Sequence, residues 1–155
     1  MSDRARAALK SLPARRIVAS QAAARPAYAA LGASIVRMSA PLVLVDARNV
    51  LRSVWPNLGE EEAARLACSW AEHGCRALVV FDRAAPDVRV GEHCTVIGSG
   101  AETADDLLTR EAATLASRGE PYWLVTSDRA LRAAAGGAAE RAIGGGAFAR
   151  ELRSA

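Results

Sequence analysis

Aspartates stand at the ends of the apolar, strand-like runs of this sequence, and their repetition restricts the chain to few folds. The run LVLVD ends at Asp46, LVVFD ends at Asp82 and WLVTSD ends at Asp128. A fourth run, CTVIG, is followed shortly by ETADD, which contains Asp105 and Asp106. In an open α/β sheet the strands end along one edge, and sites form where the strand order switches. We therefore expect these carboxylates to gather in one pocket.

Stretches with helical periodicity separate the apolar runs. We predict strands at residues 42–45, 77–81, 94–97 and 122–126, with a short fifth strand at residues 142–143. Helices are predicted from residue 60 to near residue 74, from residue 103 past residue 115, and at residues 129–135 and 148–152. Strands that alternate with helices favour a doubly wound parallel sheet. The predicted fold is therefore a three-layer α/β/α domain of Rossmann-like type, with a mainly parallel sheet of four to five strands.

The composition divides the 155 residues into a basic extension and a single domain. Residues 1–37 are rich in Ala and Arg and carry a net charge of +6, whereas residues 38–155 carry −3. The extension resembles a transit peptide in composition. A disordered or loosely helical tail, or a start codon misassigned upstream of Met38, are the alternatives. Because the basic charge lies in the extension, it is no argument that the domain binds nucleic acid.

Two residue types limit the chemistry and the compartment. Lys10 is the only lysine, which excludes a Walker A loop or a Schiff base in the domain. The three cysteines are odd in number and form no CxxC motif, which suits a reducing cytoplasm. The apolar runs are shorter than a membrane span requires. We therefore expect a cytoplasmic protein that does not enter a membrane.

Each of the strand-end aspartates also has a structural interpretation when it is taken alone. Asp46 starts the segment DARN, where Asp and Asn are common turn residues. Asp82 is a usual strand exit, and Asp128 fits the N-cap of the helix that follows it. In the functional interpretation Asp46 is a metal ligand, and Asn49 orients a ligand or binds substrate. The recurrence of acids at corresponding strand ends favours the functional interpretation.

The ETADD segment also contains a predicted helix start. Thr103 is an N-cap candidate, and first-turn acids interact favourably with the helix dipole. By the spacing of a capping box Asp106 is the cap partner, which leaves Asp105 freer to face a metal. Glu102 would either supply another ligand or remain an ordinary loop residue.

A cluster of carboxylates is costly unless a cation neutralises it, and hard cations take oxygen ligands. Carboxylates that hold one or two Mg²⁺ or Mn²⁺ ions suit phosphodiester hydrolysis. The predicted metal ligands are Asp46, Asp82, Asp105, Asp106 and Asp128. Arginines near the strand ends would clamp phosphates, with solvated surface as the alternative for each. These are Arg48, Arg52, Arg83, Arg129 and Arg132.

Trp55 lies in the loop that follows the first strand and its DARN segment. It would either stack on an exposed base, as aromatic residues do in single-strand binding, or fill the core. We prefer the core position, beside Trp70 and Trp123.

The motifs DARNVL, VVFD, ETADDLL and LVTSD, in this order, resemble those of the YacP-like branch of the NYN domain family, within the PIN-like ribonuclease superfamily. The resemblance runs from about Pro41 to the C-terminus and leaves residues 1–37 outside. It implies a PIN-like α/β/α fold and divalent-metal-dependent cleavage of RNA. ETADD and TSD are its most specific parts, because VVFD is common in α/β proteins.

The resemblance also implies which residues act. Asp46 and Asn49 match the family's first-strand D-x-x-N, while Asp105 matches the acid of E-T-A-D and Asp128 that of T-S-D. These three aspartates would be catalytic, and Asp82 matches the acid after the second strand. Where the family often has Gly-Tyr after the first acid, this chain has Ala-Arg, so an aromatic contact to substrate is missing or is provided by Trp55.

The predicted function is therefore an Mg²⁺- or Mn²⁺-dependent ribonuclease in which Asn49, Arg48 and Arg129 bind the substrate. Whether a ribosome or another protein delivers the RNA stays open. The first alternative is a module of the same fold that binds RNA or a protein without cutting, which the negative charge of residues 38–155 favours. The second, a small-molecule phosphohydrolase with an aspartyl nucleophile, lacks its usual D-x-D motif and lysine here.

Overall fold

The computed structural model describes residues 40–155. The extension predicted at residues 1–37 lies outside the described residues, and so does its predicted boundary with the domain. The described residues belong to one compact unit, Arg37–Ala155. Among them, no helix has both the length and the apolar character needed to cross a membrane.

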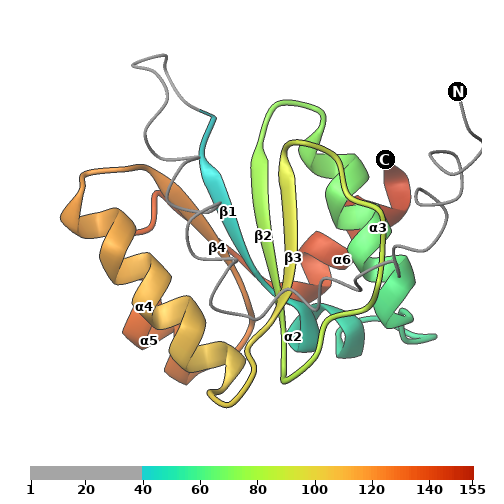
Figure 1. Ribbon diagram of the computed structural model, residues 1–155, viewed down its shortest axis with the longest axis horizontal. Helices are drawn as coiled ribbons and strands as arrows, with labels where there is room; N and C mark the ends of the chain where they lie inside the picture. Colours follow the sequence, from blue (N-terminus) through green and yellow to red (C-terminus); the bar gives the residue numbers. More distant parts are fainter. Residues whose placement is uncertain (1–39) are drawn as a thin grey trace, which may run out of the picture. The chain divides into compact units, whose positions relative to one another are not determined.

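A parallel sheet of five strands forms the centre of this unit, with the strand order β3-β2-β1-β4-β5 (Figure 1). The strands are β1 (Leu42–Asp46), β2 (Arg76–Phe81), β3 (Cys94–Gly98), β4 (Tyr122–Val125) and β5 (Arg141–Ile143). All five residues of the central strand β1 are buried. Uninterrupted apolar runs are typical of parallel strands whose two faces are both covered. The predicted α/β class and the parallel sheet are confirmed.

Helices cover both faces of the sheet, so the domain has three layers (Figure 1). The helices α2 (Ala47–Arg52), α3 (Glu60–Ala71) and α6 (Gly145–Ser154) lie on one face, and α4 (Ala104–Ser117) and α5 (Arg129–Ala135) lie on the other. The three helices on the first face pack on one another and on a core of small and branched side chains. This arrangement confirms the predicted α/β/α layers.

Two helices differ from the sequence prediction. The helix α2 was not predicted, because DARN was interpreted as a turn; Asp46 in fact caps a six-residue helix that buries Ala47 and Val50. The closing helix α6 begins at Gly145, inside the glycine run, rather than at residue 148. Packing against neighbouring helices stabilises both, because α2 is too short to be stable alone and α6 begins with two glycines of low helix propensity.

The strand order changes direction at β1. From β1 the chain proceeds outward through β2 to β3, and it then returns to the other side of β1 for β4 and β5. The carboxyl ends of β1 and β4 are therefore neighbours at the switch point, where open α/β sheets form their sites. Asp46 ends β1, and the segment Thr126–Asp128 follows β4 directly.

A disulfide joins Cys68 in α3 to Cys94 at the start of β3, with a Cα–Cα distance of 5.1 Å, and Cys75 is free. The cysteines had suggested a reducing compartment, whereas structural disulfides persist mainly in oxidising ones. The pairing arises because α3 packs against β3. The cysteine count therefore loses its value as an argument for the cytoplasm.

Candidate active site

Asp46 is the most buried acid of the strand-end group, with 6% of its surface exposed. Its Oδ1 accepts a hydrogen bond of 3.2 Å from the backbone N–H of Asn49, which caps α2. Its Oδ2 accepts one of 2.9 Å from the hydroxyl of Thr126. Asp46 therefore caps a helix instead of starting a turn, and the same carboxylate bonds to Thr126 directly after β4, at the switch point.

Thr126 connects the two strands at the switch and was not singled out by the sequence. It is fully buried, and while its hydroxyl donates to Asp46 it also accepts from the backbone N–H of Asp128 at 3.1 Å. Its carbonyl accepts a bond of 2.9 Å from Arg132 Nε. A buried polar side chain needs such partners. The threonine of the TSD motif thus fixes the relative position of two predicted catalytic acids.

Asp82 holds the start of α4 against the end of β2. Its Oδ1 accepts from the backbone N–H of Ala104 at 3.1 Å, and its Oδ2 is 3.4 Å from Arg48 Nη1. Both oxygens of this carboxylate are therefore occupied by protein partners. The bond to Ala104 brings the first turn of α4 close to the end of β2.

The first turn of α4 contains the predicted acid pair. Thr103 is the N-cap, and its Oγ1 accepts from the backbone N–H of Asp106 at 3.1 Å, as the capping prediction required. The carboxylate of Asp105 makes no hydrogen bond or ion pair within residues 40–155. Glu102 pairs with Arg110 through two hydrogen bonds, which supports its interpretation as a structural residue.

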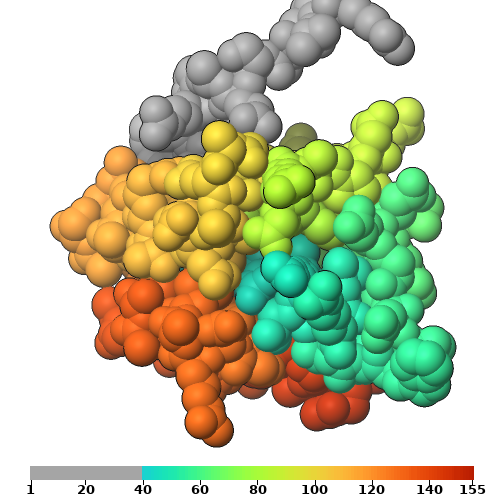
Figure 2. Space-filling view, turned by 90° about the horizontal axis from the view of Figure 1, so that it is seen from below, coloured from blue at the N-terminus to red at the C-terminus, as the bar shows by residue number. Residues whose placement is uncertain are grey.

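Asp128 is the N-cap of α5, and its Oδ1 accepts from the backbone N–H of Leu131 at 3.0 Å. The structural role suggested for this residue is therefore confirmed. The cap engages one of the two oxygens, and the side chain still contributes to the electrostatic field at Asp105. Seen from the strand ends, the segments after β1, β2, β3 and β4 adjoin one another on a single face (Figure 2).

Burial and mutual repulsion raise the pKa values of two carboxyls. For Asp46, loss of solvent is the main cause; the hydrogen bonds from Thr126 and Asn49 lower the pKa, and the charges of Asp105 and Asp82 raise it again. For Asp105, loss of solvent again raises the pKa most, followed by the charges of Asp128, Asp82 and Asp106, while Arg48 lowers it. All five predicted ligands therefore interact with at least one other member of the group.

Asp105→Asn is expected to stabilise the domain at neutral and alkaline pH. A raised carboxyl pKa means that the folded state binds the proton more tightly than the unfolded state, so this group makes the protein less stable as the pH rises above about 3.9. The uncharged amide of the Asp105→Asn variant does not ionise, so the variant does not lose this stability as the pH rises. Because the side chain is exposed, the gain in unfolding free energy should stay below about 1 kcal/mol.

Thermal unfolding at pH 4 and pH 8 measures this effect. The difference in melting temperature between variant and parent should be larger at pH 8. Asp87→Asn, in the loop between β2 and β3, is the matched control and should show no such dependence on pH. Destabilisation by Asp105→Asn at pH 8 would contradict the proposed repulsion.

A second set of contacts joins α2 to the segment after β4 and to α6. Asn49 Oδ1 accepts from the backbone N–H of Ser127 at 2.8 Å, and Ser127 Oγ accepts from the backbone N–H of Gly145 at 2.9 Å. A Cβ on Gly145 would overlap Asn49 Oδ1 and lie 2.8 Å from Ser53 Oγ. Asn49, predicted to orient a ligand or bind substrate, thus positions the loop that contains Asp128.

Gly145→Ala is expected to destabilise the domain by about 1–3 kcal/mol, the usual cost of overpacking. The added methyl group would displace the Asn49 amide and break its bond to Ser127. Chemical denaturation measures the change. Gly137→Ala is the control, because a Cβ on Gly137 meets nothing within 4 Å. Equal stability of the two variants would show that Asn49 is not held as described.

The predicted arginines have different surroundings. Arg48 pairs with Asp82, and Arg132 donates to the carbonyl of Thr126, so these two support the acids or the backbone. Arg52 and Arg129 are exposed. Arg83, directly after Asp82, has a left-handed backbone with φ of 63°, and its N–H donates to Ser99 Oγ at 3.0 Å. Arg129, next to Asp128, is therefore the predicted substrate arginine that forms no ion pair with a carboxylate in the described part.

The preferred core position of Trp55 is wrong, because 88% of this side chain is exposed. Trp70 instead packs edge-on against Phe148, with ring centroids 5.0 Å apart, and donates a hydrogen bond to Glu151. Trp123 lies under the guanidinium of Arg141 at 5.2 Å. Trp70 and Trp123 therefore pack against the core, whereas Trp55 does not.

The donors of the acid group fit a divalent cation in kind. Carboxylate oxygens are the ligands that hard cations prefer, and a cation would relieve the repulsion that raises the pKa values of Asp46 and Asp105. Within residues 40–155, however, no three His, Cys, Asp or Glu side chains are arranged so that they could hold a metal ion. The metal site therefore stays a prediction.

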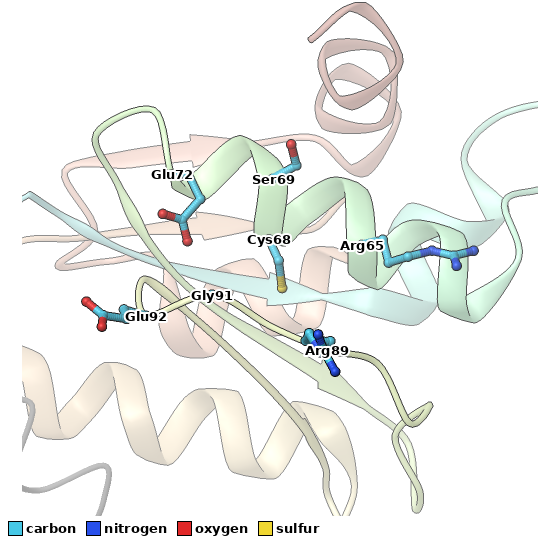
Figure 3. A pocket seen from close by; sticks show the side chains of 7 residues that line it. All are labelled: Arg65, Cys68, Ser69, Glu72, Arg89, Gly91 and Glu92. Carbon is cyan, nitrogen blue, oxygen red and sulfur yellow. The ribbon is translucent and has the colours of Figure 1, made fainter.

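A pocket lies between α3 and the loop that leads into β3 (Figure 3). It is lined by Arg65, Cys68, Ser69, Glu72, Arg89, Gly91 and Glu92. Charges of both signs surround its disulfide sulfur, and none of the strand-end aspartates lines it. This pocket is separate from the predicted site.

The sequence matches no protein-family model and no curated protein sequence. The fold is similar to the crystal structure of Rae1 (YacP) from Bacillus subtilis, with a TM-score of 0.56 and 23% identity over 74% of each chain. A mutant of the same protein gives a TM-score of 0.57 and 27% identity, over 74% of this chain and 76% of that one. The described domain therefore has the YacP-like NYN fold expected from its motifs.

Proposed function

We propose that this domain hydrolyses phosphodiester bonds of RNA with the aid of Mg²⁺ or Mn²⁺. The observation that supports the proposal best is the mutual electrostatic repulsion among five carboxylates that follow the strands of a ribonuclease-type fold. Such a concentration of negative charge is unfavourable for a binding surface that must attract phosphates, unless a cation joins it.

Asp105 and Asp128 would hold the cation most directly, with Asp46 behind them and with Asp82 and Asp106 completing the negative field. Asp105 has a carboxylate without protein partners in the described part, and Asp128 uses one oxygen in its cap. When bound, the cation would supply charge neutralisation and activation of water for attack on phosphorus. Arg129 would hold a phosphate from the exposed side, while Arg48 and Asn49 would keep Asp82 and the β4–α5 loop in place.

Incubation of the purified full chain with single-stranded and structured RNAs tests the proposal. We expect cleavage with Mn²⁺ or Mg²⁺ and none with EDTA. A preparation without any nuclease activity under these conditions, or with activity that EDTA leaves intact, would contradict metal-dependent hydrolysis.

A non-cleaving module of the same fold, which binds RNA or a protein, is the second candidate. The observation that favours it is the absence, among residues 40–155, of side chains already arranged to hold a metal ion. RNA binding that persists in EDTA, together with no cleavage in Mn²⁺, would select this candidate.

A further inference from the structure

Trp55 is exposed although the chain on both sides of it is anchored. Val54 packs against the core, and Leu58 is buried with 5% exposure. The only other large hydrophobic side chain that is strongly exposed in the described part is Val90, at 39%. An indole that is 88% exposed between two anchored residues forgoes the burial that its apolar surface favours.

The loop around Trp55 is held in place by hydrogen bonds to two helices. Ser53 closes α2, with its N–H donating to Val50 at 3.2 Å and its hydroxyl donating to the carbonyl of Asn49. Arg153 of α6 donates from Nη2 to the carbonyl of Pro56 at 2.8 Å. The indole is therefore presented by a fixed backbone, which lowers the entropy cost of binding a flat ligand on it.

Continuous contacts connect this loop with the acid group. Ser53 contacts Asn49, Asn49 accepts from Ser127, and Ser127 precedes Asp128. The helix between Asp46 and the loop has six residues and thus rises only about 9 Å. The Trp55 loop is thus tied to the segments that carry Asp46 and Asp128.

Exposed arginines border the loop on its α2 and α6 side. Arg52 ends α2, and Arg150 and Arg153 lie on α6; none of the three forms an ion pair with a carboxylate in the described part. Arg150 Nη1 is 3.6 Å from the place that a Cβ would take on Gly146, and the carbonyl of Ser53 is 3.4 Å from that same place. The acids Glu60–Glu62 begin α3 farther along the chain, which confines the basic surface to the α2 and α6 side.

We propose that Trp55 is a stacking platform for a base of single-stranded RNA, with Arg52, Arg150 and Arg153 holding the adjacent phosphates. The proposal rests on the proposed function and adds that the substrate is single-stranded where it crosses this loop. An indole offers stacking to any base that is not already covered by its neighbours, and arginines supply the backbone contacts. The basic border favours a nucleic acid over an apolar protein surface as the occupant.

Binding of a fluorescently labelled single-stranded oligoribonucleotide tests the platform. It is measured in the full-length Asp105→Asn protein, so that cleavage does not interfere, with and without Trp55→Ala. We expect Trp55→Ala to weaken binding by about tenfold, the usual effect of losing one stacked base. Trp55→Phe should restore most of the affinity, because it keeps an aromatic face. Val90→Ala is the control for loss of an exposed apolar side chain and should bind like the parent.

Equal affinity for single strands of the Asp105→Asn protein with and without Trp55→Ala would overturn the platform. A loss of affinity for duplex RNA on Trp55→Ala as large as the loss for single strands would overturn it too. Absence of RNA binding by the parent protein would overturn it as well. Cleavage by the protein with Asp105 intact is assayed separately. Trp55-dependent binding without cleavage would keep the platform and reject hydrolysis, whereas cleavage with Trp55-independent binding would do the reverse.

Discussion

Asp105→Asn should reduce RNA cleavage by at least about 100-fold, which corresponds to about 2.7 kcal/mol of lost transition-state stabilisation. The Asp105 carboxylate makes no hydrogen bond or ion pair within residues 40–155. Loss of solvent raises its pKa most, and the charges of Asp128, Asp82 and Asp106 raise it further. An amide there has the same shape but no charge with which to hold a divalent cation. Initial rates of RNA cleavage in Mn²⁺ measure the loss.

The same substitution is expected to leave the fold intact or to stabilise it, so lost activity cannot be attributed to unfolding. Asp87→Asn provides a protein of equal net charge, altered at an acid that is not among those acting on Asp46 and Asp105, and it should cleave like the parent. Retention of full activity by nuclease-free Asp105→Asn protein would remove Asp105 from the catalytic group.

Thr126→Val should combine a loss of stability with a shift in the pH dependence of cleavage. The valine has nearly the same shape, but Asp46 Oδ2 and the N–H of Asp128 both lose their hydroxyl partner. A buried group left without a partner costs about 1–3 kcal/mol. The Thr126 hydroxyl also lowers the pKa of Asp46. Without it the pKa rises further, so the acidic limb of the rate profile should move to higher pH.

Thr126→Ser retains the hydroxyl and is the control for this prediction. It should keep the pH profile of the parent, with a smaller loss of stability from the missing methyl group. A Thr126→Val protein whose acidic limb coincides with that of the parent would show that Asp46 does not need to be ionised for cleavage. Denaturant unfolding and rates measured from pH 4 to pH 9 separate the two effects.

The sheet could be predicted because its strands are buried on both faces. Runs such as residues 42–45 and 77–81 are apolar throughout, and helical periodicity between them leaves little choice but a parallel sheet. The placement of Asp46 and Asp128 followed from that sheet, because both come at strand ends beside the switch in strand order. The capping of α4 by Thr103 followed from local spacing alone.

Features that depend on distant contacts could not be predicted in this way. The helix α2 is too short to show a period, and its stability comes from α3 and α6, which follow later in the chain. The exposure of Trp55 depends on where the loop between α2 and α3 lies on the folded domain. Pairing of Cys68 with Cys94 depends on the packing of α3 on β3, which the cysteine count does not contain.

The roles of Thr126, Ser127 and Gly145 also depend on contacts between distant parts of the chain. The two hydroxyls were visible beside Asp128, but their partners, Asp46 and the backbone of Gly145, come from other parts of the chain. The sequence signal was the glycine run after β5, where a side chain would collide with Asn49. The close approach of the Asn49 and Ser53 side chains explains this glycine, and only the tertiary structure reveals it.

Binding of Mn²⁺ tests the central claim most directly. It is measured as the loss of the free-ion signal in electron paramagnetic resonance. The carboxylates at the switch point are claimed to form a cation site, and the full-length protein should therefore bind Mn²⁺ in competition with Mg²⁺. Binding should be weakened at least about tenfold by Asp105→Asn and remain unchanged in Asp87→Asn. Equal Mn²⁺ binding by the parent and Asp105→Asn proteins, or none by the parent, would contradict the account.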